Sequence, residues 1–362
     1  MPGLHEAQLR HATFYFSLLS RIGEIYKQGG KNALEGLQLL EPDWNNIRNG
    51  QIWTSAYAAD DDKAARLLLD LNQHEGAILL LDLYQPPQER VDWLETALAA
   101  AKRMNLRDAE GRASGNLGSA YISLGRSRQA LKYLEQYLLI SRDIGYRRGE
   151  GVALALMAGA NENLGRRDVV IDCSEQALAI ARLIGDKRME AASLAQLGTA
   201  FKNLGEPKRA IEFYQQSLTL LRGGNDQRSE AAVLGDLGLA YSELDETDQA
   251  IEFHKQSLQL ARETGDRVTE SNEIGNLGLA YAAKAELHQA IEMYDEQLKI
   301  VRQIGFLRGE ANALFNKGVA LESLGERVQA IKHAQDALSI YDRIEHPNAH
   351  MVRRTLTEWE TD

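Results

Sequence analysis

The most regular feature of the sequence is a pattern of small residues that recurs every forty positions. One column of this pattern contains only alanine, namely Ala120, Ala160, Ala200, Ala240, Ala280 and Ala320. A second column contains Gly118, Gly198, Gly238, Gly278 and Gly318, with Ala158 in the remaining repeat. A column that admits only small side chains indicates that two helix backbones approach closely there. The pattern predicts six repeats in register over residues 110–345.

Each repeat contains two apolar stripes with helical spacing. In the first repeat the apolar stripe consists of Leu117, Ala120, Tyr121 and Leu124, whose spacings of three and four positions place them on one face of a helix. This stripe predicts a first helix, helix A, which ends near Gly125. A second stripe begins at Ala130 and continues as Leu131, Leu134 and Leu138, which predicts helix B. Each repeat is therefore expected to be a helical hairpin that buries its apolar side against its neighbours.

The joins between repeats contain signals for helix ends. Arginines near the ends of the B helices suit the negative end of the helix dipole, and the following glycines are typical C-terminal caps. Glutamates then begin the next A helices, where a carboxylate is favourable. These residues are Arg142, Arg182, Arg222, Arg262 and Arg302; Gly145, Gly185, Gly265 and Gly305; and Glu150, Glu190, Glu230, Glu270 and Glu310. The join GGND at 223–226 departs from this pattern and predicts a looser turn.

The two ends of the chain differ from the regular array. Residues 1–60 predict a helical N-terminal segment that is out of register with the repeats. Residues 61–109 predict degenerate hairpins of the same kind, including a helix that starts at a proline in PPQERVDW. Residues 346–362 predict a C-terminal capping helix, with Met351, Val352 and Leu356 covering the last apolar face.

Composition narrows the class of protein. Of the 362 residues, 44% are hydrophobic and only six are proline, which favours an all-α chain. The net charge of −11 disfavours direct binding to nucleic acid or to an anionic membrane. The single cysteine, Cys173, excludes an intrachain disulfide, and neither a signal core nor an apolar run of about 20 residues is present. We expect a cytoplasmic protein.

Candidate chemistry is scarce. The string GNLGLAY at 275–281 looks like a phosphate-binding loop, but it lies inside a predicted helix, where consecutive free N–H groups are not available. His333 stands in a column of otherwise apolar residues and is expected in the core. The carboxylate pairs Asp61-Asp62 and Asp245-Glu246 fall in turns. We predict no catalytic residue, cofactor or metal; the alternative is an enzyme without a recognisable motif.

The repeat motif resembles a known family. L-G-x-x-Y in helix A followed by A-[IL]-x-x-[FY] in helix B resembles the tetratricopeptide repeat. The forty-residue variety, with a longer B helix and a D-x-R-x-E turn, is seen in Pins-type polarity scaffolds and many bacterial signalling proteins. The resemblance implies an all-α, right-handed superhelical solenoid of helical hairpins that binds proteins or peptides. Leucine-rich and WD repeats are excluded because nothing alternates with period two.

The N-terminal segment carries a second resemblance. The matching residues are Arg10-His11-Ala12 with Tyr15 and Phe16, then Asp43, Asn46-Ile47-Arg48 and Trp53. With these residues the segment resembles the helical segment after the winged helix in signal transduction ATPases with numerous domains (STAND), which include maltose-regulator-like and NB-ARC proteins. Asn49-Gly50 departs from the alanines usual there, and GGKN at 29–32 lacks the glycine and Ser/Thr of a phosphate loop. The resemblance implies the ligand- or partner-sensing region of a larger bacterial protein with an upstream nucleotide-binding domain. The alternative is a free-standing scaffold of the Pins-like type.

The predicted binding surface follows from the A helices, which line the concave face of tetratricopeptide arrays. Asparagine amides both donate and accept, so a row of them one repeat apart can pair with the backbone of an extended peptide, while leucines contact its side chains. Pins-type arrays use asparagines similarly. We predict a partner in the C-terminal half, with Asn276 and Asn316 central; the alternative is ordinary polar residues facing solvent. The predicted site comprises Asp236, Leu239, Asn272, Asn276, Leu279, Asn312, Asn316 and Val319.

Overall fold

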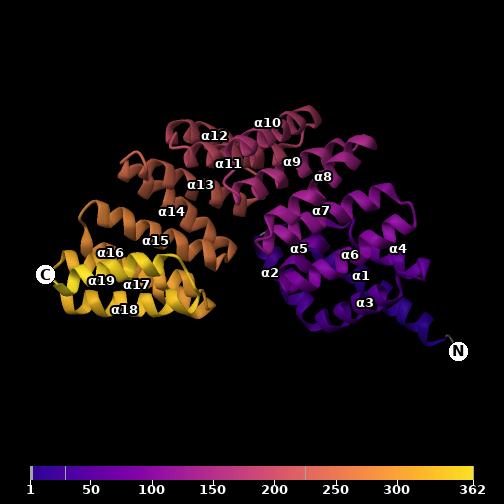
Figure 1. Cartoon of the computed structure of the whole chain (residues 1–362), viewed down its shortest axis with the longest axis horizontal. Coiled ribbons are helices and arrows are strands. Elements are labelled where there is room, and N and C mark those ends of the chain that lie inside the picture. Colours follow the sequence, from indigo (N-terminus) through magenta and orange to yellow (C-terminus); the bar gives the residue numbers. More distant parts are fainter. Residues whose placement is uncertain (1–2, 29, 225, 362) are drawn as a thin grey trace. The chain divides into compact units, whose positions relative to one another are not determined.

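The computed structural model describes residues 3–28, 30–224 and 226–361, and this part of the chain is helical throughout, with short turns and no strand (Figure 1). The first helices are α1 (Leu4–Tyr26), α2 (Gly30–Leu40), a 3-10 turn (Glu41–Asp43), α3 (Trp44–Tyr57), α4 (Asp62–Leu71), α5 (Glu75–Tyr84) and α6 (Pro87–Arg103).

The repeats follow as alternating A and B helices. The A helices are α7 (Arg107–Ser123), α9 (Arg147–Glu162), α11 (Lys187–Asn203), α13 (Gln227–Ser242), α15 (Arg267–Ala283) and α17 (Leu307–Ser323). The B helices are α8 (Ser127–Asp143), α10 (Arg167–Ile184), α12 (Pro207–Leu221), α14 (Thr247–Thr264), α16 (Leu287–Ile304) and α18 (Arg327–Arg343), and α19 (Asn348–Thr361) ends the chain. The predicted all-helical array of hairpins is confirmed.

The chain divides into two compact units. The first contains residues 1–205 and 219–226, and the second contains residues 206–218 and 227–362. In the first unit α1 packs against α2, α3 and α5. A Cβ atom added to Gly23 or Gly76 would lie 2.3 Å from the backbone of the other glycine, so these two glycines allow α1 and α5 to cross in direct backbone contact. Helices α6 to α11 then pack in sequence, and α6 starts with the predicted proline.

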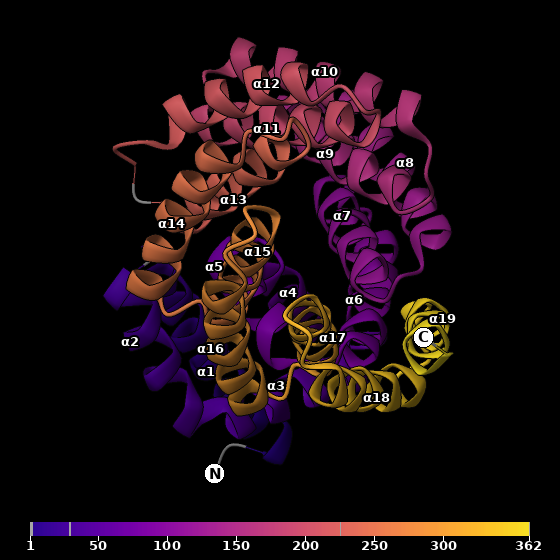
Figure 2. The ribbon, with the colours of Figure 1, turned by 90° about the vertical axis from the view of Figure 1, so that its left-hand side faces the viewer.

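In the second unit α13 packs with α14, α15 with α16, and α17 with α18, while the A helices α13, α15 and α17 contact one another in turn (Figure 2). The predicted column of small residues faces the B helix of its own hairpin. A Cβ atom on Gly238 would lie 2.5 Å from the ring of His254, and one on Gly278 would lie 2.5 Å from the ring of Tyr294. Bulky B-helix side chains therefore explain why only small residues occur in this column.

Left-handed residues end most helices. The four predicted C-terminal caps, Gly145, Gly185, Gly265 and Gly305, have φ between 67° and 72°, which confirms their role. The turns inside the hairpins also need this conformation. Two of them supply it without glycine, at Asp245 (φ 60°) and Ala285 (φ 59°). Of the join predicted to be looser, residue 225 lies outside the described residues, and Gly223 has φ 84°.

The charged residues at the joins bind one another. Arg142, at the end of α8, donates to Glu150 of α9 at 2.8 Å, and Arg147 donates to the same carboxylate at 2.7 Å. The sequence pattern predicts only that these charges interact with the helix dipoles. Among the described residues this carboxylate clamp recurs as Arg182 and Lys187 on Glu190, Arg262 and Arg267 on Glu270, and Arg302 on Glu310.

The C-terminal helix α19 packs on α18. Val352 and Leu356 are buried in one apolar cluster with Leu314 and Tyr341, as predicted for a capping helix. The prediction for Met351 is wrong, because its side chain is 40% exposed. Met351 directly precedes Val352, and adjacent helix positions point about 100° apart, so only one of them can face the core.

Candidate functional site

The predicted site residues lie on the three A helices of the second unit. Asn272 is exposed, and the large apolar side chains of Leu279 and Val319 are 49% and 40% exposed. The other predicted residues, Asp236, Leu239, Asn276, Asn312 and Asn316, are half-buried. We call these eight residues the A-helix face. Because α13 contacts α15 and α15 contacts α17, the structure brings their columns together.

The asparagines of this face differ in their bonding. The side-chain oxygen of Asn312 accepts a hydrogen bond from the hydroxyl of Tyr341, which leaves its NH2 group to donate to a partner. In the part of the chain that the structure describes, the side-chain amides of Asn276 and Asn316 form no hydrogen bond. Each of these two amides therefore retains a donor and an acceptor.

In the first unit the amides of the column that contains Asn276 and Asn316 form hydrogen bonds within the protein. Asn116 donates to the side-chain oxygen of Asn72 at 3.2 Å, and Gln196 donates to the carbonyl oxygen of Ala155 at 3.0 Å. These amides bind other helices of their own unit. The forty-residue spacing alone places all four amides in one column, whereas only the structure distinguishes the bonded pair from the free pair.

The charge of the A-helix face is low. Asp236 is the one charged residue among the eight, and Lys317, next to Asn316, forms an ion pair with Asp295 at 2.6 Å. The Lys317 side chain is only 15% exposed. The face thus offers amides and apolar groups, which favours an uncharged ligand surface over a strongly charged one.

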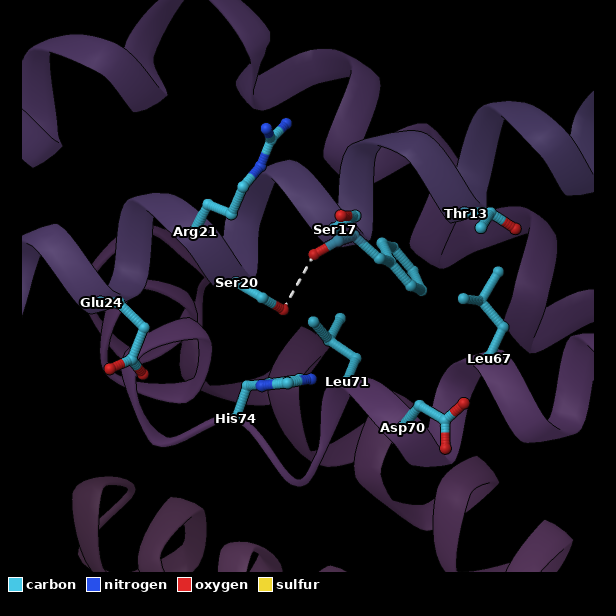
Figure 3. A pocket seen from close by; sticks show the side chains of 10 residues that line it. Thr13, Ser17, Ser20, Arg21, Glu24, Leu67, Asp70, Leu71 and His74 are labelled. Atoms are coloured by element: carbon cyan, nitrogen blue, oxygen red, sulfur yellow. Dashed lines mark hydrogen bonds between the residues drawn. The ribbon is translucent and has the colours of Figure 1, made fainter.

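A pocket of 440 Å³ lies between α1 and α4 in the first unit, with His74 at its edge (Figure 3). The ring of His74 is directed toward Leu71 and Ser20, whose hydroxyl donates to the carbonyl oxygen of Phe16 at 3.0 Å. Arg21 and Glu24 are exposed. Its buried floor consists of Phe16 and Leu71, and most of its polar and charged side chains lie at the exposed rim, so the pocket lacks buried polar groups that would orient a ligand.

Other residues singled out by the sequence have structural roles. Asp61 caps α4 by accepting hydrogen bonds from the backbone of Lys63 and Ala64, and Asp245 lies in a turn, as predicted. His333 is half-buried beside α17, and desolvation together with Lys317 lowers its pKa. The sequence pattern missed one buried pair, in which Nδ1 of His254 lies 2.6 Å from a carboxylate oxygen of Glu273.

Comparison with protein families matches the repeats. Models of the tetratricopeptide repeat match residues 111–144, 151–223, 233–268 and 270–343, which together are more than half of the chain. The chain is a tetratricopeptide repeat protein. This family assignment agrees with the observed hairpins and makes protein or peptide binding the general function of the array. A search among curated proteins finds no match. Within the described part of the chain, no helix combines the length and apolar character needed to cross a membrane.

Three solved structures share the fold at low sequence identity. A STAND protein with a tetratricopeptide repeat sensor from Pyrococcus horikoshii has a TM-score of 0.62 at 16% identity, covering 89% of this chain and 48% of that one. The quorum sensor NprR from B. thuringiensis, in its apo form, has a TM-score of 0.58 at 14% identity over 89% of this tetratricopeptide repeat protein and 95% of NprR. The apo form of RapI has a TM-score of 0.58 at 11% identity, and the match covers 78% of this chain and 98% of RapI. The chain thus spans about half the length of the STAND protein.

Proposed function

We propose that this tetratricopeptide repeat protein is a non-catalytic binding module whose A-helix face holds an extended segment of a partner protein. The observation that carries the proposal is the bonding of the amide column. Asn116 and Gln196 bind within the first unit, whereas Asn276 and Asn316 keep their donors and acceptors free. Amides that are not bonded within the protein can donate to and accept from the backbone of a partner.

The spacing of the repeats fits an extended peptide. Packed helices lie about 8–10 Å apart, and an extended chain advances about 3.3 Å per residue. Asn276 and Asn316, on neighbouring A helices, would therefore bind backbone groups about three residues apart. Leu279 and Val319 would contact the side chains between them. The low charge of the face supports a partner segment that is uncharged and contains apolar residues.

We further propose that this module is the partner-sensing region of a cytoplasmic STAND-type signalling ATPase or regulator. Two observations support the assignment: the N-terminal pattern Arg10-His11-Ala12 with Trp53, and the likeness of fold to a STAND protein over 89% of this chain. In that arrangement a parent chain supplies the nucleotide-binding domain upstream, and this region reports partner binding to it.

A free-standing receptor or scaffold is the second candidate. The likeness to NprR over 95% of that protein supports it, because NprR is a quorum sensor of comparable size. The genomic reading frame distinguishes the two. A nucleotide-binding domain encoded in frame upstream of residue 1 supports the sensor region, and a stop codon directly upstream supports the free-standing protein.

The A-helix face is tested by selecting binding peptides from a random library on the purified chain and measuring their Kd. The double variant Asn276→Ala/Asn316→Ala should weaken binding at least about tenfold, because two backbone-pairing groups are removed. Its Tm should stay nearly unchanged or rise slightly, since alanine is the better helix former.

Gln259→Ala, at an exposed position on B helix α14 of the same unit, is the matched control and should leave Kd unchanged. Unaltered affinity of the double variant for every selected peptide would refute the placement of the site.

A further inference from the structure

A second pocket in the first unit has a polar floor. It lies between α3 and α6, has a volume of 330 Å³, and is lined by Gln51 from α3, Gln85 just after α5, and Trp93 from α6. These three side chains are only 3%, 7% and 4% exposed. Polar groups buried to this extent normally have hydrogen-bond partners.

Here each of the three retains an unpartnered polar atom. The NH2 group of Gln85 donates to the side-chain oxygen of Gln51 at 3.0 Å. The NH2 group of Gln51, the side-chain oxygen of Gln85 and the indole N–H of Trp93 have no partner among the described residues. Exchanging oxygen and nitrogen in both amides still leaves one free donor and one free acceptor.

This set of groups complements a carboxamide. The oxygen of a ligand amide can accept from the indole and from one glutamine, while its NH2 group donates to the free glutamine oxygen. The unpartnered atoms are covered by neighbouring protein atoms, and because the terminal torsion of glutamine is soft, a turn of either amide presents its free group to the pocket. Arg90 lies over the Trp93 ring, 5.8 Å from its centre, and thereby holds the indole in place.

Charged groups surround the mouth of the pocket. Arg48 pairs with Glu89 at 2.7 Å, with both side chains more than 40% exposed. The carboxylate of Asp92 accepts a hydrogen bond from Gln88 at 3.0 Å. One guanidinium and two carboxylates can receive the carboxylate and the ammonium group of an amino acid, and they disfavour a simple anion. The volume is at the small end of ligand pockets.

We propose that the pocket between α3 and α6 binds a small zwitterion with a primary carboxamide, the chemistry of a free carboxamide amino acid. The carboxamide occupies the floor formed by Gln51, Gln85 and Trp93, and the charged end lies at Arg48 and Asp92. The site lies in the first unit, so it does not depend on the proposed peptide-binding face of the second unit.

The test is a titration of the ¹⁵N-labelled full chain with L-glutamine and with L-asparagine, following the indole N–H signals by NMR. Trp93→Phe assigns the Trp93 signal. We expect a saturable shift of that signal with at least one carboxamide amino acid, and no shift of the Trp359 signal. L-Glutamate and L-leucine, which lack the carboxamide, should bind at least about tenfold more weakly, because they leave buried polar groups of the site unpaired.

The double variant Gln51→Met/Gln85→Met separates a ligand site from a structural network. Removing both amides should leave the Tm of the free protein unchanged or higher, since it removes unpaired polar atoms, and should abolish the response to the amino acids. A marked fall in Tm shows that the amides stabilise the fold and contradicts the proposal. A flat titration of the wild-type chain, or equal binding of glutamate and glutamine, also overturns it; a flat titration means that the floor holds only water.

Discussion

At the scale of single residues, His254 and Glu273 form a polar pair where other repeats use different chemistry. The two side chains are only 1% and 8% exposed and lie 2.6 Å apart. One repeat later the same columns contain Tyr294 and Ala313, and Gly278 faces Tyr294 as Gly238 faces His254. A tyrosine therefore fits this column, and the buried pair is not needed for packing.

Double-mutant analysis tests this interpretation. His254→Tyr alone should destabilise the chain by about 3–5 kcal/mol, because it leaves a buried carboxylate without its partner. Glu273→Ala alone should cost about 1–3 kcal/mol by leaving the imidazole unpaired. The double variant, which copies the next repeat, should be close to wild type or more stable. Urea unfolding measures all three. Effects that add to within about 0.5 kcal/mol would contradict the coupling.

At the scale of elements, the turn between the two helices of a hairpin requires a left-handed residue. Glycine supplies it at 125, 165, 205 and 325, whereas Ala285 adopts φ 59°. A non-glycine residue in this conformation costs about 1–2 kcal/mol. The turn after α15 is therefore strained in a way that the equivalent glycine turns are not.

Ala285→Gly should raise the stability of the chain by up to about 1 kcal/mol, because relief of the strain outweighs the extra entropy of the unfolded glycine. Thermal unfolding followed by circular dichroism measures the change. Ala283→Gly, two residues earlier and still in α15, is the control and should destabilise by about 1 kcal/mol or less. If both variants lose stability equally, the left-handed residue is not a source of strain.

At the scale of the whole molecule, carboxylate clamps tie four of the B helices, α8, α10, α14 and α16, to the A helix that follows each of them. Burial raises the pKa of Glu150, but hydrogen bonds from Arg142 and Arg147 outweigh it, and the pKa is lowered. At Glu190 the hydrogen bond from Lys187 is the largest cause of a lowered pKa. Because the folded pKa lies below the ordinary value of 4.5, this stabilisation is complete above that value and is lost as the pH falls through the folded pKa.

We therefore expect the Tm to be nearly constant near neutral pH and to fall below about pH 5. Glu150→Gln/Glu190→Gln should lower the Tm at pH 7 and flatten its fall in acid, because the variant has no such carboxylates to protonate. Glu212→Gln/Glu243→Gln, at exposed positions, is the matched control and should keep the wild-type profile. An equal acid slope in the clamp variant would show that other groups govern the pH dependence.

The helical hairpins and the repeat family follow from local patterns in the amino-acid sequence. Helical stripes, glycine caps and small-residue columns such as Gly238 and Gly278 are local signals, and the forty-residue period repeats them, so each hairpin confirms the next. The period also places Asn276 and Asn316 in one column. It does not determine which side-chain amides of that column are bonded within the protein and which are not.

Contacts between residues far apart along the chain depend on how the helices pack. The hydrogen bond between Gln51 and Gln85 spans 34 residues, and the direct contact of Gly23 with Gly76 falls in the part without a regular repeat. In the array, Asn116 donates a hydrogen bond to Asn72, whereas among the described residues Asn276 and Asn316 of the same column have no side-chain hydrogen bond. Periodicity specifies which face of a helix a residue occupies, whereas its partner depends on how helices distant in sequence pack.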